Sequence, residues 1–422
     1  MAPSASTRTR ALLIPPSNRT LRDPAAAAGD GLVPVTGLQP VPLTPDLVHG
    51  AVELETSDGG LRPHRLPAWA RAQNADPMLA INEGQPAGVR LVLRTTATAV
   101  ELDAVVTRRA LTGAPARPEG QVDLVVDGEV KDGAVVPNGD LLTTDMTTGA
   151  TTLVEGGAGT VRFPLPAGEK TVELWLPHQE GVELVALRAD APVTAVPRDG
   201  RPRWVHHGSS ISHGSNAVRP TGTWPVVAAR TAGLDLVNLG FGGSAVLDPF
   251  VARTMRDLDA DLLSLKVGIN IVGGDLMRRR VLGPALHGFL DTVREGHPTT
   301  PLLVVTPVLC PIHEETPGPG SVDVEALREG RLVFTATGDP AEVPAGRLTL
   351  RTVREELARV VEQRRADDPN LHLVDGLAMY GPDDVAAHPL PDALHPDEET
   401  HGLMGERFAR TVFAGGGPFP TT

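Results

Sequence analysis

One serine and one Asp–His pair are the residues of this chain with the clearest potential for chemistry. Ser210 stands in a turn that follows a short apolar strand, two residues after Gly208. Asp392 stands three residues before His395, so its carboxylate can orient the imidazole. A serine hydroxyl becomes a nucleophile when an imidazole accepts its proton. If the fold brings these three side chains together, they indicate a serine hydrolase or a serine-dependent acyltransferase.

Simpler roles exist for each of these residues. Ser210 alone could be a turn or helix-capping serine, and Asp392 could be a turn residue. Ser209 is a rival nucleophile because it directly precedes Ser210. His388 and His401 are rival bases, but neither has an Asp three residues before it. The strand-to-turn position and the Asp spacing therefore favour the serine and the histidine named first.

The composition argues against several classes of protein. The 422 residues include 52 acidic and 38 basic side chains, which gives a net charge of −14. Binding to nucleic acid depends on Lys and Arg that neutralise phosphates. No apolar run approaches the ~20 residues of a membrane span, and the first residues lack the apolar run of a secretory signal. We therefore expect no nucleic-acid partner, no membrane partner and a cytoplasmic location.

No metal or cofactor is expected. The single cysteine, Cys310, excludes a disulfide framework and a thiolate zinc site, and its apolar surroundings predict an inert core thiol. His206, His207 and His213 are close in sequence, but no carboxylate accompanies them as a metal ligand. Residues 240–245 fit a weak Gly-x-Gly-x-x-Ala dinucleotide pattern, yet the acidic residue expected after the next strand is missing.

The first half of the chain predicts strands. Apolar and polar residues largely alternate over residues 89–94 and 99–105, the pattern of half-buried strands. Similar short stretches follow, separated by Gly, Pro and Asp turns, with no convincing helix among them. We predict an all-β, jelly-roll-like sandwich over residues 31–196, after a loose segment over residues 1–30.

The pattern changes after a predicted linker over residues 197–203. Alternating strands and helices follow, which predict a parallel sheet covered by helices on both sides. The result is a three-layer α/β/α, flavodoxin-like domain over residues 204–422. Ligands of such sheets bind beyond the carboxyl ends of the strands, and Ser210 follows the first strand. The first predicted strand starts at residues 204–205, and the others are residues 234–239, 261–267, 302–308 and 371–374.

Four sequence blocks at these strand ends and near the C-terminus resemble those of the GDSL or SGNH hydrolase family. They are Gly208-Ser209-Ser210-Ile211, Asn238 to Gly243, Gly268-Ile269-Asn270 and Asp392-x-x-His395, in the family's order. The resemblance implies a triad with Ser210 as nucleophile and Asp392 and His395 as its partners. It also implies an oxyanion hole built from the N–H groups of Ser210 and Gly243 and the Nδ2 of Asn270. The family's Asp before the nucleophile is Ser209 here.

The N-terminal half resembles the sandwich domain of one actinobacterial branch of this family, over residues 67–71 and the strands from residue 88 onward. Carbohydrate esterases of the family share this domain order. The resemblance implies a serine esterase that hydrolyses a small carboxylic ester, for example an acetylated sugar or glycoside, through an acyl-serine intermediate. One alternative is an acyltransferase that passes the acyl group to an alcohol of a small molecule or natural product. A second alternative is a non-catalytic carbohydrate-binding protein.

The segment over residues 314–347 is rich in Gly, Pro and acidic residues. We expect it to be an insertion near the site that sets specificity. Residues 332–336 within it predict a strand, which could form half of a small hairpin.

Overall fold

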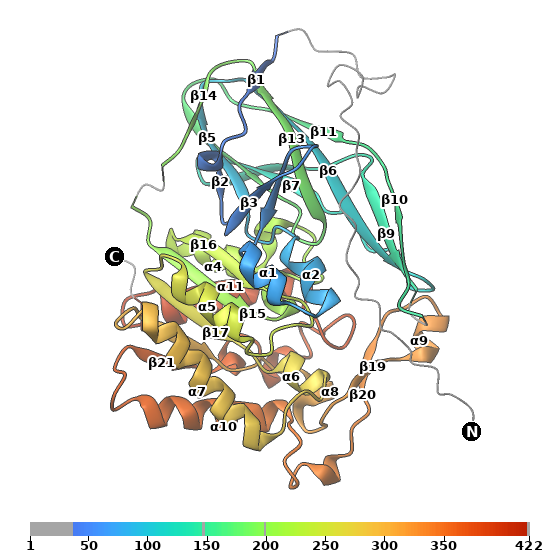
Figure 1. The fold of residues 1–422 in the computed structure, drawn as a ribbon, viewed down its shortest axis with the longest axis vertical. Coiled ribbons are helices and arrows are strands. Elements are labelled where there is room, and N and C mark those ends of the chain that lie inside the picture. Colours follow the sequence, from blue (N-terminus) through green and yellow to red (C-terminus); the bar gives the residue numbers. More distant parts are fainter. Residues whose placement is uncertain (1–36, 146–147, 198–199, 420–422) are drawn as a thin grey trace, which may run out of the picture. The chain divides into compact units, whose positions relative to one another are not determined.

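Two β-sheets form the N-terminal part of the chain in the computed structural model, which describes residues 37–145, 148–197 and 200–419 (Figure 1). The loose segment predicted over residues 1–30 lies outside the described residues. The strands are β1 Gln39–Val41, β2 Val48–His49, β3 Glu53–Thr56, β4 Leu61–His64, β5 Arg90–Thr95, β6 Ala99–Leu111, β7 Gln121–Val126, β8 Glu129–Val135, β9 Asp140–Thr144, β10 Thr151–Val154, β11 Gly159–Pro164, β12 Lys170–Trp175, β13 Gly181–Ala189 and β14 Val193–Ala195.

The larger sheet has eight strands in the order β10-β9-β6-β13-β4-β3, with β1 also paired to β13 and β11 to β6. The smaller sheet has six strands in the order β14-β5-β12-β7-β8, with β2 paired to β5. Alternation builds the core between the sheets. In β11, for example, Val161 and Phe163 are buried while Arg162 is exposed. Leu91 and Leu93 of β5 share that buried cluster. The predicted sandwich is confirmed.

Two short helices that the strand pattern did not predict lie between β4 and β5. They are α1, Ala68–Gln73, and α2, Pro77–Glu83. Asp76 caps α2 by accepting a hydrogen bond from the backbone N–H of Met78, and Pro77 occupies the first helical position. Leu79 of α2 is buried in the core of the C-terminal part of the chain. The two helices therefore connect the sandwich to the second half.

A five-stranded parallel sheet forms the second half. Its strands are β15 Arg203–Gly208, β16 Asp235–Gly240, β17 Leu262–Lys266, β18 Leu302–Val305 and β21 Leu371–Val374, in the order β16-β15-β17-β18-β21. In chain order this is the 2-1-3-4-5 arrangement of flavodoxin-like sheets, whose ligands bind where the order reverses. Residues 302–305 are wholly buried, as a strand with helices on both faces requires. The predicted fold class is confirmed.

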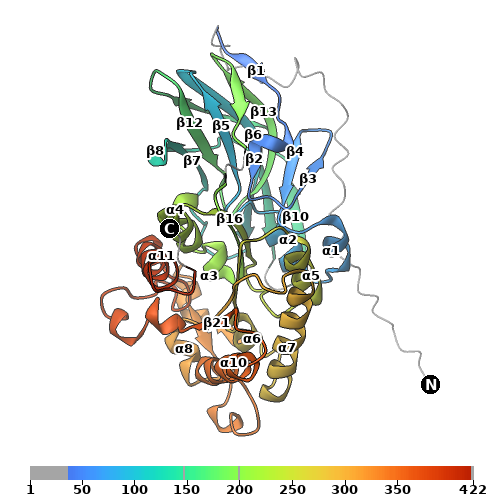
Figure 2. The same cartoon turned by 90° about the vertical axis from the view of Figure 1, so that its left-hand side faces the viewer.

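Helices cover both faces of this sheet. The helices of this half are α3 Ser210–His213, α4 Trp224–Ala232, α5 Pro249–Asp257, α6 Ile269–Gly273, α7 Arg279–Gly296, α8 Pro311–Glu314, α9 Val324–Arg328, α10 Leu350–Arg364 and α11 Glu398–Val412. Figure 2 shows α4 and α11 on one side of the sheet and α5 and α7 on the other. A small hairpin of β19 Gly320–Val322 and β20 Phe334–Ala336 lies within the predicted insertion. The 3-10 helices are Pro45–Leu47, Pro220–Gly222, Pro340–Glu342, Gly376–Ala378 and Pro382–Asp384.

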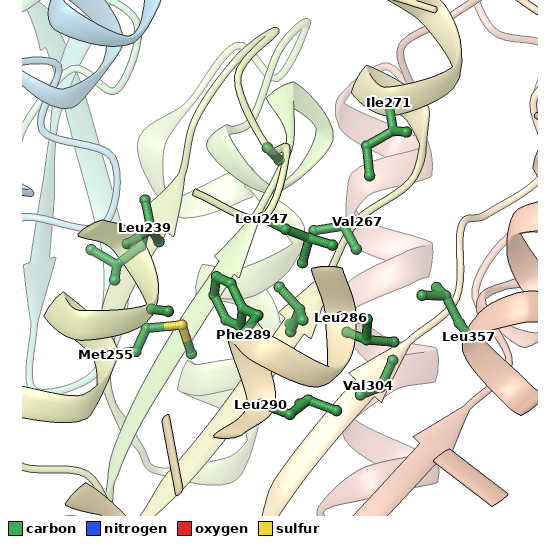
Figure 3. Packing of buried hydrophobic residues seen from close by; sticks show 14 of the residues in the cluster. Leu239, Leu247, Met255, Val267, Ile271, Leu286, Phe289, Leu290, Val304 and Leu357 are labelled. Carbon is green, nitrogen blue, oxygen red and sulfur yellow. The ribbon is translucent and has the colours of Figure 1, made fainter. Parts of the chain in front are cut away.

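Large apolar side chains fill the space between the sheet and α5, α7 and α10. Figure 3 shows Met255 of α5 near Leu239 of β16, with Phe289 and Leu290 of α7 in the same buried cluster. Leu357 of α10 belongs to the same buried cluster. On the opposite face, a second cluster is formed by the side chains of α4 and α11 with Trp204 of β15. This packing fixes the strands, and with them the loops that leave their carboxyl ends.

Candidate active site

Ser210 begins a one-turn helix directly after the first parallel strand. β15 ends at Gly208, and Ser209 is the N-cap of α3, where its Oγ accepts a hydrogen bond from the N–H of Ile211. A side chain at position 208 would lie 2.2 Å from the Oγ of Ser212, so the turn requires glycine there. Ser209 therefore holds the turn through a cap, the role that a short acidic side chain would also fill.

The structure brings Ser210, His395 and Asp392 into one hydrogen-bonded chain. His395 Nε2 lies 2.9 Å from the Oγ of Ser210, and His395 Nδ1 lies 2.7 Å from Oδ2 of Asp392. The carboxylate fixes the proton on Nδ1, which leaves Nε2 free to accept the serine proton. Ser210 is only 8% exposed and Asp392 7%. Residues 185 positions apart therefore meet with the geometry of a nucleophile, a base and an orienting acid.

The Asp392 carboxylate is held by four hydrogen bonds. Oδ1 accepts from the backbone N–H groups of Leu394 and His395 at 2.9 and 2.6 Å. Oδ2 accepts from the His395 ring and from Nδ2 of Asn216 at 3.0 Å. Burial would raise the pKa of Asp392, but the hydrogen bonds and the charge of His395 outweigh it and hold the pKa below its usual value. Asn216 was not singled out by the sequence pattern.

The rival residues have other partners. Ser209 Oγ caps α3, as described above. His401 is fully buried, with its Nδ1 accepting from the N–H of Trp224 and its Nε2 3.0 Å from the carbonyl of Ser215. Burial lowers the pKa of His401 to about 4. His388 Nδ1 lies 3.7 Å from a carboxylate oxygen of Glu399. The geometry therefore favours Ser210 and His395.

The two remaining residues of the predicted oxyanion hole lie beyond the next two strands. Gly243 follows β16 with a φ of 73°, a left-handed conformation that suits glycine. Asn270 lies in the first turn of α6, after β17, and its Oδ1 accepts a hydrogen bond from the N–H of Ala245 at 3.1 Å. This bond occupies the amide oxygen and fixes the orientation of the side chain. Nδ2 therefore points away from the Ala245 N–H and remains available as a donor. Both residues stand at the sheet edge where Ser210 lies.

The N-terminal part of the chain holds the loop that contains Gly243. Arg65 is fully buried, and its guanidinium donates to the carbonyls of Asn238 at 3.0 Å and Gly240 at 2.6 Å. The same guanidinium donates to the carbonyl of Asn82, whose side-chain amide donates to the carbonyl of Gly242. Burial lowers the pKa of Arg65 to about 9, with Glu83 acting in the opposite direction. The sequence analysis missed these contacts; the pair Asp76-Pro77, typical of a helix start, is the signal that could have indicated α2.

The three clustered histidines each have a structural role. His206 lies between the hydroxyls of Ser264 and Ser212, at 2.7 and 2.8 Å. His207 Nδ1 lies 2.7 Å from the carbonyl of Leu239, and His213 binds the carbonyl of His178. Among the residues that the structure describes, no group of three His, Cys, Asp or Glu side chains could hold a metal ion.

The predicted insertion contacts the Asp–His loop. The ring of Phe334, at the start of β20, meets the His395 imidazole edge-on, with 5.6 Å between the ring centres. The backbone N–H of Phe334 donates to the carbonyl of Asp392 at 2.9 Å. The hairpin therefore lies beside His395, the candidate general base. There it can restrict which substrates reach Ser210.

A buried Ser–His–Asp chain at the carboxyl edge of a 2-1-3-4-5 sheet is the arrangement of an SGNH-type serine hydrolase. Residues 202–310 match the GDSL-like lipase/acylhydrolase family, and residues 47–185 match the SsfX3 N-terminal domain. The chain therefore contains a GDSL-like lipase/acylhydrolase domain preceded by an SsfX3-type N-terminal domain, and it is an SGNH-type enzyme. The actinobacterial branch stays a prediction, as do the domain boundaries.

Solved structures are similar to this chain over most of its length. The salicylyl-acyltransferase SsfX3 from a tetracycline biosynthetic pathway is 28% identical, with a TM-score of 0.65, over 90% of this chain and 95% of that chain. A GDSL-like lipase from Bacteroides ovatus is 20% identical (TM-score 0.61; 88% and 96% covered). A family two carbohydrate esterase from Cellvibrio japonicus is 12% identical (TM-score 0.51; 88% and 96% covered). The last two share the fold. No curated protein sequence matches the chain.

The structure also bears on two further sequence predictions, one about Cys310 and one about membrane spans. Cys310 is buried, and burial raises the pKa of its thiol to about 12, as expected of an inert core thiol. Within the described residues, no helix is long and apolar enough to cross a membrane. The cytoplasmic location stays a prediction.

Proposed function

We propose that the protein is a serine esterase that hydrolyses a small carboxylic ester through an acyl intermediate on Ser210. The observation that carries this proposal is the unbroken chain from Ser210 Oγ through His395 to Asp392. His395 Nε2 takes the serine proton as Oγ attacks the ester carbonyl, and the Asp392 carboxylate stabilises the imidazolium that forms. His395 then gives the proton to the departing alcohol, and a water molecule releases the acid by the same steps in reverse.

The negative charge that develops on the carbonyl oxygen needs donors that are already in place. In this proposal the N–H groups of Ser210 and Gly243 and the Nδ2 of Asn270 supply them. The hydrogen bond from Ala245 to Asn270 supports this assignment, because it orients the amide before the substrate binds. One such donor is typically worth roughly 3–4 kcal/mol in the transition state.

The first test replaces the nucleophile. Ser210→Ala removes the attacking oxygen, so turnover of para-nitrophenyl acetate should fall by at least about 10³-fold while the circular dichroism spectrum is unchanged. Ser209→Ala is the matched control, because it removes a neighbouring hydroxyl that caps α3, and it should keep labelling by a fluorophosphonate probe. Full turnover in the Ser210 variant would show that Ser210 is not the nucleophile. Loss of labelling in the Ser209 variant alone would assign the nucleophile to Ser209.

Acyl transfer to an alcohol is a second candidate function with the same triad. It is favoured by the 28% identity to the salicylyl-acyltransferase over nearly the whole chain. The two functions differ only in the acceptor that attacks the acyl-enzyme. Mixing an activated acyl ester with candidate alcohols in water and measuring ester against free acid decides between them. An excess of free acid under every condition supports the esterase.

The acetylated sugar or glycoside remains the proposed ester, and the partner is a small molecule. Two tryptophans of the N-terminal part could stack on a sugar, but both rings have partners. Trp175 is only 2% exposed, with the Arg90 guanidinium over its ring, and Arg253 lies over the ring of Trp69. A non-catalytic carbohydrate-binding protein, the remaining alternative, would give no covalent adduct with the fluorophosphonate probe.

A further inference from the structure

Two arginines of the sandwich have no carboxylate at ion-pair distance among the described residues. Arg109 lies near the end of the long strand β6, and Arg117 lies in the loop between β6 and β7. Their neighbour Arg108 contacts carboxylates of Glu119 and Glu180, both at 3.3 Å. Arg109 and Arg117, by contrast, form no ion pair with any residue that the structure describes. In a protein with a net charge of −14, two such neighbouring cations are a distinctive feature.

Arg109 lies next to the predicted oxyanion loop. Its Nη2 is 3.5 Å from the sulfur of Met78 in α2. Met78 Cγ in turn lies 3.6 Å from the point that a side chain on Gly243 would occupy. Only one side chain therefore separates the Arg109 guanidinium from the loop after β16.

Arg117 lies on the Asp392 side of the same site. Its Nη1 is 3.5 Å from the side-chain oxygen of Gln179, whose amide donates to the carbonyl of Ala217 at 3.3 Å. Ala217 follows Asn216, which holds the Asp392 carboxylate. The surrounding protein lowers the pKa of Arg117, and the charge of Asp392 acts in the opposite direction. The two arginines thus border the triad and the oxyanion loop.

The two guanidinium groups also act on each other. Burial and then the charge of Arg117 lower the pKa of Arg109 to about 10. Both guanidinium groups remain cationic near neutral pH. Each has further N–H donors beyond the one that contacts a described side chain. A pair of repelling guanidiniums is relieved by an anion, and the planar fork of arginine fits carboxylate and phosphate oxygens.

We propose that Arg109 and Arg117 form a subsite for an anionic group, a carboxylate or a phosphate, carried by the ester substrate away from the reacting carbonyl. This inference rests on the proposed function, because it assigns the substrate class of the same site. It gives the sandwich a direct part in substrate choice. The anion can belong to the acyl group or to the alcohol, and the two sources are separable by experiment.

The test compares esters that differ in where they carry charge, with the full-length protein. They are para-nitrophenyl acetate, which is neutral, para-nitrophenyl hemisuccinate, with a carboxylate on the acyl group, and para-acetoxyphenyl phosphate, with a phosphate on the alcohol. At least one anionic ester should have a higher kcat/KM than the neutral ester. The Arg109→Gln, Arg117→Gln double variant should lower that preference by about 10- to 100-fold, mainly through KM. The preferred ester identifies the source of the anion.

Arg162→Gln is the matched control. Arg162 of β11 donates to Glu101 of β6. Glu101 lies eight residues before Arg109 on β6, which is about 26 Å along the strand. This variant removes one positive charge from the same strand pair by the same Arg→Gln change, away from the proposed subsite, and should keep the preference. A wild-type protein that favours neither anionic ester, or a double variant with an unchanged preference, would overturn the proposal.

Calorimetry in the Ser210→Ala background separates this proposal from the proposed function. The anionic esters should bind Ser210→Ala more tightly than they bind the variant that also lacks both arginines. This comparison needs no turnover, so it decides the subsite even if Ser210 proves not to be the nucleophile. Equal binding to the two proteins would remove the subsite while the esterase assignment stands.

Discussion

At the scale of single residues, the orientation of Asp392 is set before any substrate arrives. Its neighbour Ala393 has a φ of 65°, which turns the chain so that the N–H groups of Leu394 and His395 both point back at the carboxylate. A non-glycine residue in this conformation is uncommon and costs energy, so the surrounding contacts must hold it. The four hydrogen bonds on the carboxylate do this and keep it ionised next to the imidazole.

Asn216 should act as a positioning residue for Asp392. It adopts a φ of 67°, which glycine also tolerates, so Asn216→Gly removes the amide without straining the backbone. A hydrogen bond to a charged group is worth about 1.5–3 kcal/mol, and we expect kcat to fall by about 10-fold or more with little change in KM. Steady-state kinetics on para-nitrophenyl acetate measures both. A change in KM alone, with kcat retained, would show that Asn216 contacts substrate rather than orienting the acid.

At the scale of elements, the parallel sheet was predictable from the sequence, but the helices α1 and α2 that pack against its domain were not. The strands of the sheet are mostly buried and largely apolar because helices cover both faces, so the sequence shows roughly where each strand lies and which residues lie beyond its end. The helices α1 and α2 have only six and seven residues, too few for a helical period to stand out. Their buried contacts are with segments about 160 residues away. A sequence pattern does not show such contacts.

The insertion illustrates the same limit. Residues 332–336 predicted a strand, and β20 is observed at residues 334–336, paired with β19. The pairing with residues 320–322 was not predicted, because helix α9 separates the two strands. The contact of Phe334 with His395 depends on that pairing, so it too became visible only in the fold.

Asn82 should tune the oxyanion loop from the other half of the chain. Asn82→Ala removes the donor to the Gly242 carbonyl, and the adjacent Gly243 N–H then loses its fixed direction. We expect kcat on para-nitrophenyl acetate to fall by about 10-fold or more, since a misdirected donor gives up part of its transition-state stabilisation. Asn74→Ala is the matched control, because Asn74 bonds only within its own segment. Equal kinetics in the two variants would show that the loop holds its own conformation.

At the scale of the whole molecule, the two halves share packed cores and buried charges. Arg90 of the sandwich donates to Asp235 of the parallel sheet at 2.7 Å, with both side chains buried. Residues from both halves also appear in the same apolar clusters: Leu66, Ala70 and Leu79 with the α5 and α7 side chains, and Val125 and Trp175 with Trp204 and Trp224. The chain thus passes from the sandwich to the parallel sheet at the predicted linker, but the two halves pack against each other. The sandwich completes the core around the active site.

Five of the buried histidines in the described residues have strongly lowered pKa values, and they make the molecule sensitive to acid. They are His178, His206, His207, His213 and His401. Burial lowers the pKa of three of them to about 4 and of His206 and His213 well below the usual value. Above pH ~6.5 these rings are neutral whether the chain is folded or not, so they do not affect stability. Below it, the unfolded chain binds protons that the folded chain excludes.

Stability should therefore fall as the pH drops from about 6.5 towards 4, before the buried carboxylates begin to protonate. Each histidine contributes up to about 1.4 kcal/mol per pH unit, so five together exceed a typical domain's stability within about two units. Urea unfolding followed by circular dichroism at pH 8, 7, 6 and 5 measures the slope. His178→Gln keeps a donor for the Gly214 carbonyl that His178 Nε2 contacts, and should reduce the slope by about one proton. A free energy of unfolding that is constant from pH 7 to pH 5 would mean that water reaches these rings in the folded protein.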